Sequence, residues 1–111
     1  MKTLKSKKVL GGIALVMVFL NPAQASTTWG ASDCGEWVNQ SKVSPSMRTW
    51  LYGFMTGLGA MNELNGSKDD PLKKLNSADQ ITVWMDNFCQ KNPLKTVAGG
   101  GVTLFYELQK K

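Results

Sequence analysis

Residues 44–64 read SPSMRTWLYGFMTGLGAMNEL, and apolar side chains recur in this segment at steps of three and four. That spacing places them along one face of a helix. Ser44 can cap the first turn through its hydroxyl, and Pro45 suits the first helical position because no N–H is needed there. The segment therefore predicts a long amphipathic helix. Its apolar stripe consists of Met47, Trp50, Leu51, Phe54, Met55, Leu58 and Met61.

The same helix carries Gly53 and Gly57, four positions apart, with Ala60 after them. Such a ridge of small residues lets another backbone approach closely, and in a membrane it would suggest a dimer face. Arg48 and Glu63 lie near the ends of this helix, however, and it lacks a full apolar span. We expect Gly53 and Gly57 to mark a close helix crossing inside a bundle.

Shorter helical segments flank the long one. Ser32 or Asp33 can cap a short helix that carries Cys34, Trp37 and Val38. After the turn-rich loop 65–71, Leu72 and Leu75 have the spacing of a single helical turn.

Two more helices are predicted in the C-terminal part of the chain. Ser77 and Gln80 have the spacing of a capping box, with the serine as N-cap. Asn92-Pro93 would end that helix and start the next, in which residues 99–101 are all glycine and either break the helix or permit close packing. The two apolar stripes are Ile81, Trp84, Met85 and Phe88, then Leu94, Val97, Ala98, Gly101, Leu104, Phe105 and Leu108. The predicted fold is all-α, a small four-helix orthogonal bundle with no strand.

The N-terminal residues have the pattern of a secretory signal peptide. Four lysines precede an apolar run from Val9 to Leu20, and Ala23-Gln24-Ala25 matches the small-x-small rule for cleavage. An uncleaved membrane anchor is the alternative, but about a dozen apolar residues is short of the roughly 20 that span a bilayer. We predict a signal peptide over 1–25, cleavage after Ala25, and a single periplasmic domain over 26–111.

Removal of this segment changes the charge balance. It contains four of the 13 basic residues and none of the eight acidic ones, so nine basic and eight acidic residues remain. Nucleic-acid binding, which a basic pI would otherwise suggest, is not expected. The pairs Lys73-Lys74 and Lys110-Lys111 are interpreted as solvated faces.

Cys34 and Cys89 are the only cysteines. In an exported protein an even count favours a disulfide over free thiols. A domain of 86 residues is also small enough to need such a bond. We therefore predict a Cys34–Cys89 disulfide that joins the first short helix to the Trp84 helix.

The sequence offers little for catalysis. It has no histidine, which removes Ser-His and Cys-His pairs and most zinc sites, and it has no phosphate-loop or nucleophile-elbow motif. No cofactor, metal site or enzymatic activity is predicted. Asp86, in the segment Trp84-Met85-Asp86-Asn87-Phe88-Cys89, is assigned a structural or partner-binding role, and Trp29, outside every apolar stripe, is the second candidate for binding a partner.

Three motifs carry a family resemblance: Cys34-x-x-Trp37, Trp50-Leu51-x-Gly53-x-x-x-Gly57, and a C-terminal motif over residues 84–94 that reads WMDNFCQKNPL. They resemble small exported proteobacterial proteins of the HdeA acid-chaperone type and the Rap/Tai immunity type. The general plan is also similar to exported proteins encoded in conjugative-plasmid transfer regions, of the host-killing KikA type. The resemblance implies a helical fold tied by one disulfide.

The function predicted from these features is an exported, non-enzymatic protein that binds a protein partner, in a conjugation or envelope context or as an immunity factor. A host-killing effector is the alternative, and a periplasmic chaperone is the third possibility. A homodimer is also possible, and no stable membrane span is expected after processing.

Overall fold

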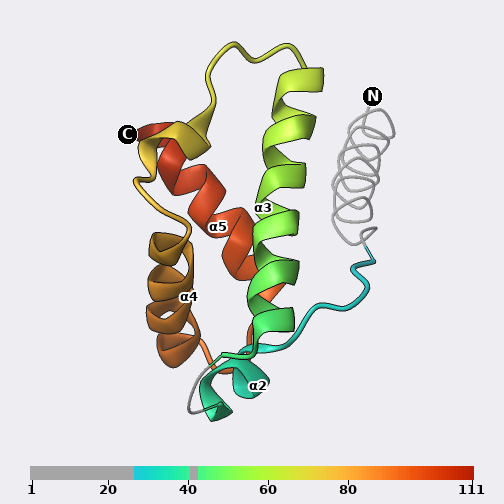
Figure 1. Cartoon of the computed structure of the whole chain (residues 1–111), viewed down its shortest axis with the longest axis vertical. Coiled ribbons are helices and arrows are strands. Elements are labelled where there is room, and N and C mark those ends of the chain that lie inside the picture. Colours follow the sequence, from blue (N-terminus) through green and yellow to red (C-terminus); the bar gives the residue numbers. More distant parts are fainter. Residues whose placement is uncertain (1–26, 41–42) are drawn as a thin grey trace, which may run out of the picture.

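The computed structural model describes residues 27–40 and 43–111, which form a helical domain without strands (Figure 1). The predicted signal peptide and its cleavage after Ala25 lie outside these residues. The helices are α2 (Cys34–Asn39), α3 (Pro45–Leu64), α4 (Asp79–Lys91) and α5 (Val97–Lys110), with the 3₁₀ turn η2 (Pro71–Lys74) between α3 and α4. The prediction of an all-α fold with four helices is thereby confirmed.

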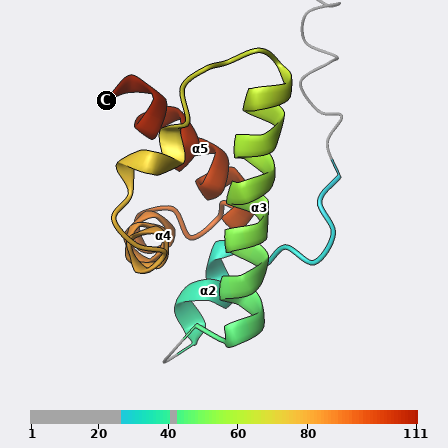
Figure 2. The same ribbon diagram turned by 45° about the horizontal axis from the view of Figure 1, so that its top comes forward.

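The helices cross one another. α5 packs against α3, α4 and η2, while α2 packs against α4 and closes one end of the bundle (Figure 1). In Figure 2 α4 is seen end-on while α3 lies lengthwise, so these two helices are far from parallel. A crossing arrangement leaves α4 and α5 in contact along only part of their lengths, and this creates the groove described below.

The starts of α2 and α3 agree with the predictions. Asp33 caps α2 by accepting a hydrogen bond of 2.7 Å from the backbone N–H of Glu36. Ser44 caps α3 by accepting one of 3.3 Å from Met47, and Pro45 occupies the first turn. In both cases local side-chain chemistry alone fixes the boundary.

The predicted capping box at Ser77 is wrong in its pairing. Ser77 makes no side-chain cap, because Ala78 precedes α4 in a helical conformation and carries no capping group. The side chain of Gln80 does reach back, but it accepts from the N–H of Asn76, at 2.6 Å. Only one of the two reciprocal hydrogen bonds of a capping box is therefore present, and its backbone donor is Asn76 instead of Ser77.

The predicted start of the last helix is also wrong. Asn92-Pro93 ends α4, but Leu94 lies in a turn and is 99% exposed. α5 begins at Val97, with Thr96 as its N-cap through a 3.0 Å bond from the N–H of Gly99. The cause lies in tertiary structure, since the backbone just before α5 pairs with the segment that leads into α2.

That pairing surrounds the disulfide. The N–H of Cys34 donates to the carbonyl of Lys95 at 2.9 Å, and the N–H of Val97 donates to Ser32 at 3.0 Å. Cys34 and Cys89 are bonded, with their Cα atoms 4.8 Å apart, and both are fully buried. The predicted disulfide is confirmed, and we call these two backbone bonds and the disulfide together the N-terminal clasp.

The core collects the apolar stripes of all four helices. Trp37, Leu51, Met55 and Met85 are each at most 1% exposed. Val97, Leu104, Phe105 and Leu108 line the α5 side of this core, and Cys34, Ile81 and Cys89 complete it.

Close helix packing occurs at Gly100 and Gly101, one of the two alternatives for the glycine run 99–101, and is not found at Gly53 and Gly57 among the described residues. Gly53 and Gly57 are exposed, and a Cβ built on either would have no described atom within 4 Å. Within residues 27–40 and 43–111, no helix crosses α3 at Gly53 or Gly57. A Cβ on Gly100 would instead lie 2.6 Å from the sulfur of Met85, and one on Gly101 would lie 2.9 Å from the ring of Phe54. α5 continues through the glycine run without a break, and side chains of α3 and α4 pack against its backbone there.

Candidate functional site

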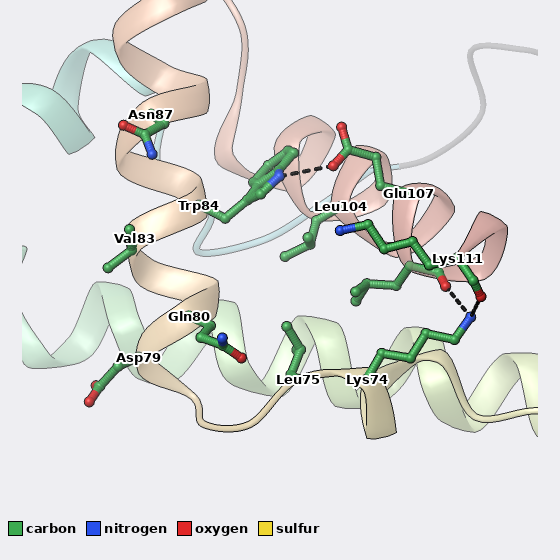
Figure 3. Close-up of a pocket in the computed structure, with 11 residues that line it drawn as sticks. Lys74, Leu75, Asp79, Gln80, Val83, Trp84, Asn87, Leu104, Glu107 and Lys111 are labelled. Atoms are coloured by element: carbon green, nitrogen blue, oxygen red, sulfur yellow. Dashed lines mark hydrogen bonds between the residues drawn. The ribbon is translucent and has the colours of Figure 1, made fainter.

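An open groove of about 470 Å³ lies between η2, α4 and α5 (Figure 3). Leu104 and Leu108 of α5 form its buried floor, and Leu75 and Trp84 are half-buried beside them. Val83 stands at its edge with 58% of its surface exposed. The groove therefore presents a mainly apolar surface to solvent.

The helical repeat explains how two separate helices line this groove. α4 contributes Gln80, Val83, Trp84 and Asn87, with Asp79 beside them, and α5 contributes Leu104, Glu107 and Leu108, followed by Lys111 directly after the helix end. The first four have the spacing i, i+3, i+4, i+7 and the three of α5 the spacing i, i+3, i+4, and each spacing defines one face of a helix. The groove is thus walled by one face of each helix, and Leu75 and Lys74 close it on the η2 side (Figure 3).

Trp84 is held in place across the groove. Its indole N–H donates to a carboxylate oxygen of Glu107 at 3.0 Å, and its ring stacks on Phe88 with the centroids 5.1 Å apart. These two contacts fix the orientation of the ring. Glu107 is consequently engaged with a neighbouring side chain of the same domain.

The η2 side is anchored through a lysine. The ammonium of Lys74 donates to the carbonyls of Leu108 and Lys111 at the end of α5. A cation at this position satisfies carbonyls that have no partner within the helix and stabilises its negative end. One lysine from each of two pairs far apart in sequence, Lys74 and Lys111, therefore lies at the same end of the groove.

Asp86 lies outside this groove, in a separate and more polar pocket of about 360 Å³ between α2, α3 and α4. Its carboxylate accepts a 2.7 Å hydrogen bond from the indole of Trp37, whose side chain is 1% exposed. Arg48 lines the same pocket but donates to the carbonyl of Val43 at 2.8 Å. Asp86 thus satisfies a buried donor of the core.

This contact predicts the effect of substituting Asp86. In Asp86→Ala the buried N–H of Trp37 loses its acceptor, and the free energy of unfolding falls by about 1 to 3 kcal/mol. Asp86→Asn keeps an oxygen at the same place and serves as the matched control, with a smaller loss. Urea unfolding followed by circular dichroism measures both. An Asp86→Ala variant as stable as the parent would contradict a structural role for this carboxylate.

The other predicted binding residue, Trp29, is 86% exposed and does not line the groove. Its backbone is nevertheless fixed, because its carbonyl accepts a 2.8 Å hydrogen bond from the indole of Trp50. Gly30 follows at φ +77° and packs against Trp50, in a conformation that favours glycine. Partner binding by Trp29 stays a prediction.

The sequence pattern does not single out the residues of the groove. Trp84, Leu104 and Leu108 belong to predicted helical stripes and Leu75 to a predicted single turn, and the spacing does not tell which part of a stripe stays uncovered. Val83 lies beside the apolar stripe of α4, and an apolar residue at such a position is the sequence signal that indicates the groove. An apolar residue beside a stripe widens the apolar face beyond what the core needs.

No cluster of three or more acidic or cysteine side chains that could hold a metal ion occurs in residues 27–40 and 43–111. In that part of the chain, none of the helices combines the length and the apolar character that a bilayer crossing requires. The chain gives no significant match to a family model, to a curated protein or to a solved structure.

Proposed function

We propose that this chain is exported and acts outside the cytoplasm as a non-enzymatic protein that binds another protein through the groove between η2, α4 and α5. The observation that carries the proposal is the open apolar surface of Val83, Trp84 and Leu75 above a leucine floor. Uncovered apolar surface that is rimmed by polar groups is typical of binding sites.

Export is supported by two independent features. A buried disulfide is typical of proteins that fold in an oxidising compartment. The lysine-rich start, the apolar run and Ala23-Gln24-Ala25 fit a cleaved leader. A partner would then be met in the cell envelope, in conjugation or as the target of an immunity factor.

A binding role is favoured over catalysis by what the carboxylates do. Asp33 and Asp70 accept hydrogen bonds from backbone N–H groups at the starts of α2 and η2. Asp86 and Glu107 each accept from a tryptophan indole. These four acids therefore stabilise the fold, whereas paired catalytic acids would face each other across one cleft.

Site-specific photo-crosslinking tests the proposal. A photoreactive amino acid placed at Val83, in cells that express the chain from its own locus, is expected to give adducts of defined mass in the envelope fraction. Tyr106 is the matched control, because it is 59% exposed against 58% for Val83 and does not line the groove. The intact mass of the unreacted chain is expected to correspond to a start at Ser26.

Three outcomes would contradict the proposal. Equal adducts from both positions, or none from Val83, would remove the groove as a docking surface. A full-length chain confined to the cytoplasm would remove export.

A further inference from the structure

We infer that the partner of the groove is an amphipathic helix with an acidic side chain beside its apolar stripe, and that Lys111 binds this acidic side chain. The inference rests on the proposed function, because it names the chemistry of the partner that the same groove takes.

The shape of the groove favours a helix over an extended peptide. The α4 wall is one helical face of two turns, i, i+3, i+4, i+7, about 10 Å long, and the α5 wall runs over the last turn of its helix and ends at Lys111. A third helix packs into such a pair of walls and presents apolar side chains at the same three- and four-residue steps. An extended strand of that length would point only about two side chains toward the floor. The apolar floor of Leu104 and Leu108 therefore matches a helical ligand better.

The charged side chains at the rim of the groove indicate the sign of the charge that the partner carries there. The ammonium of Lys74 is occupied by the carbonyls of Leu108 and Lys111, and the carboxylate of Glu107 accepts from Trp84. The side chain of Lys111 extends back along α5 toward Leu104, and its ammonium makes no hydrogen bond to the other groove residues (Figure 3). It is thus a cation available to a ligand at the mouth of the groove.

The remaining charge at the rim has a different role. Asp79 lies in the first turn of α4, where a carboxylate stabilises the positive end of the helix. It is also placed away from Lys111 in Figure 3. A carboxylate on the ligand is therefore expected at the Lys111 end of the groove.

Two synthetic peptides serve as probes. Both are 18-residue helices with the same leucine stripe, and they differ only in carrying glutamate or glutamine beside it. The readout is the indole N–H signal of Trp84 in a proton–nitrogen NMR spectrum, with the signal of buried Trp37 as internal reference. We expect the glutamate peptide to bind about two- to fivefold more tightly at low salt. The difference should fade at high salt, because screening weakens exposed ion pairs.

A pair of lysine variants separates a specific contact from general attraction. Lys111→Glu is expected to abolish or reverse the preference for the glutamate peptide. Lys110→Glu makes the same change in net charge at the neighbouring position, which does not line the groove, and should keep the preference.

Three outcomes would overturn the inference. They are equal affinities for the two peptides, equal effects of the two lysine variants, and a Trp84 shift caused by phosphatidylglycerol vesicles but by neither peptide. The last result would identify a lipid surface as the ligand. If the peptides fail while Val83 still yields protein adducts, the helical acidic partner is excluded and the proposed function stands. If neither peptide binds and Val83 gives no protein adducts, the inference and the proposed function are both excluded.

Discussion

Replacement of Cys34 or Cys89 by serine is expected to lower the free energy of unfolding by about 2 to 5 kcal/mol. For a domain of this size that corresponds to a fall in melting temperature of about 10 °C or more. The bond closes a loop between residues 55 positions apart, so its loss raises the conformational entropy of the unfolded chain considerably. Both side chains are fully buried, so each serine would also place a hydroxyl in an apolar site.

Thermal unfolding followed by circular dichroism measures this effect. The double variant Cys34→Ser/Cys89→Ser is the control, and it should be little less stable than either single variant because one substitution already removes the bond. Thiol titration of the unfolded parent should find no free thiol. Single variants that melt like the parent would show that the helix packing alone stabilises the fold.

Substitution of Gly100 or Gly101 by alanine should destabilise the domain by about 1 to 3 kcal/mol, although alanine is the better helix former. A Cβ at Gly100 would lie 2.6 Å from the sulfur of Met85 and 2.8 Å from the ring of Phe88. Met85 is fully buried and Phe88 is stacked on Trp84, so neither can move freely. At Gly101 the ring of Phe54, itself stacked on Trp50, stands 2.9 Å away. Part of α5 must therefore shift to admit either methyl group.

Gly53→Ala and Gly57→Ala are the matched controls. Both glycines lie in the middle of α3, and no described atom stands within 4 Å of the added Cβ. Without a clash, the gain in helix propensity should raise stability by about 0.5 to 1 kcal/mol. Chemical unfolding of the four variants tests the contrast. Losses of similar size in all four would show that Gly53 and Gly57 are covered after all.

Features set by neighbouring residues could be predicted from the sequence. The start of α3 depends on the hydroxyl of Ser44 and the ring of Pro45, both within one turn of the boundary. The start of α2 depends in the same way on Asp33. The disulfide could be predicted because only one pairing of two cysteines exists, and the export predicted from residues 1–25 favours that pairing.

Features set by distant segments could not be predicted. Pro93 had the local chemistry of a helix start, but Pro93 and Leu94 lie in a turn. The backbone bonds from Cys34 to Lys95 and from Val97 to Ser32 then keep the chain non-helical up to the extended Thr96. The spacing of the glycines shows where a backbone approach is possible, not which face is covered. The groove depends on how α4 and α5 cross, which no periodicity within either helix reveals.

The N-terminal clasp also bears on the order in which the domain assembles. Its backbone bonds join residues 32–34 to residues 95–97, so α2, α3, η2 and α4 lie inside the loop that they close and α5 follows it. Contacts so distant in sequence cost the most chain entropy and are commonly made late in folding. The packing of α5 on α3 and α4 can therefore precede the docking of α2. The disulfide then forms when most of the tertiary structure is already in place. Residues 32–40 are the part of the domain that would detach first if the disulfide were removed.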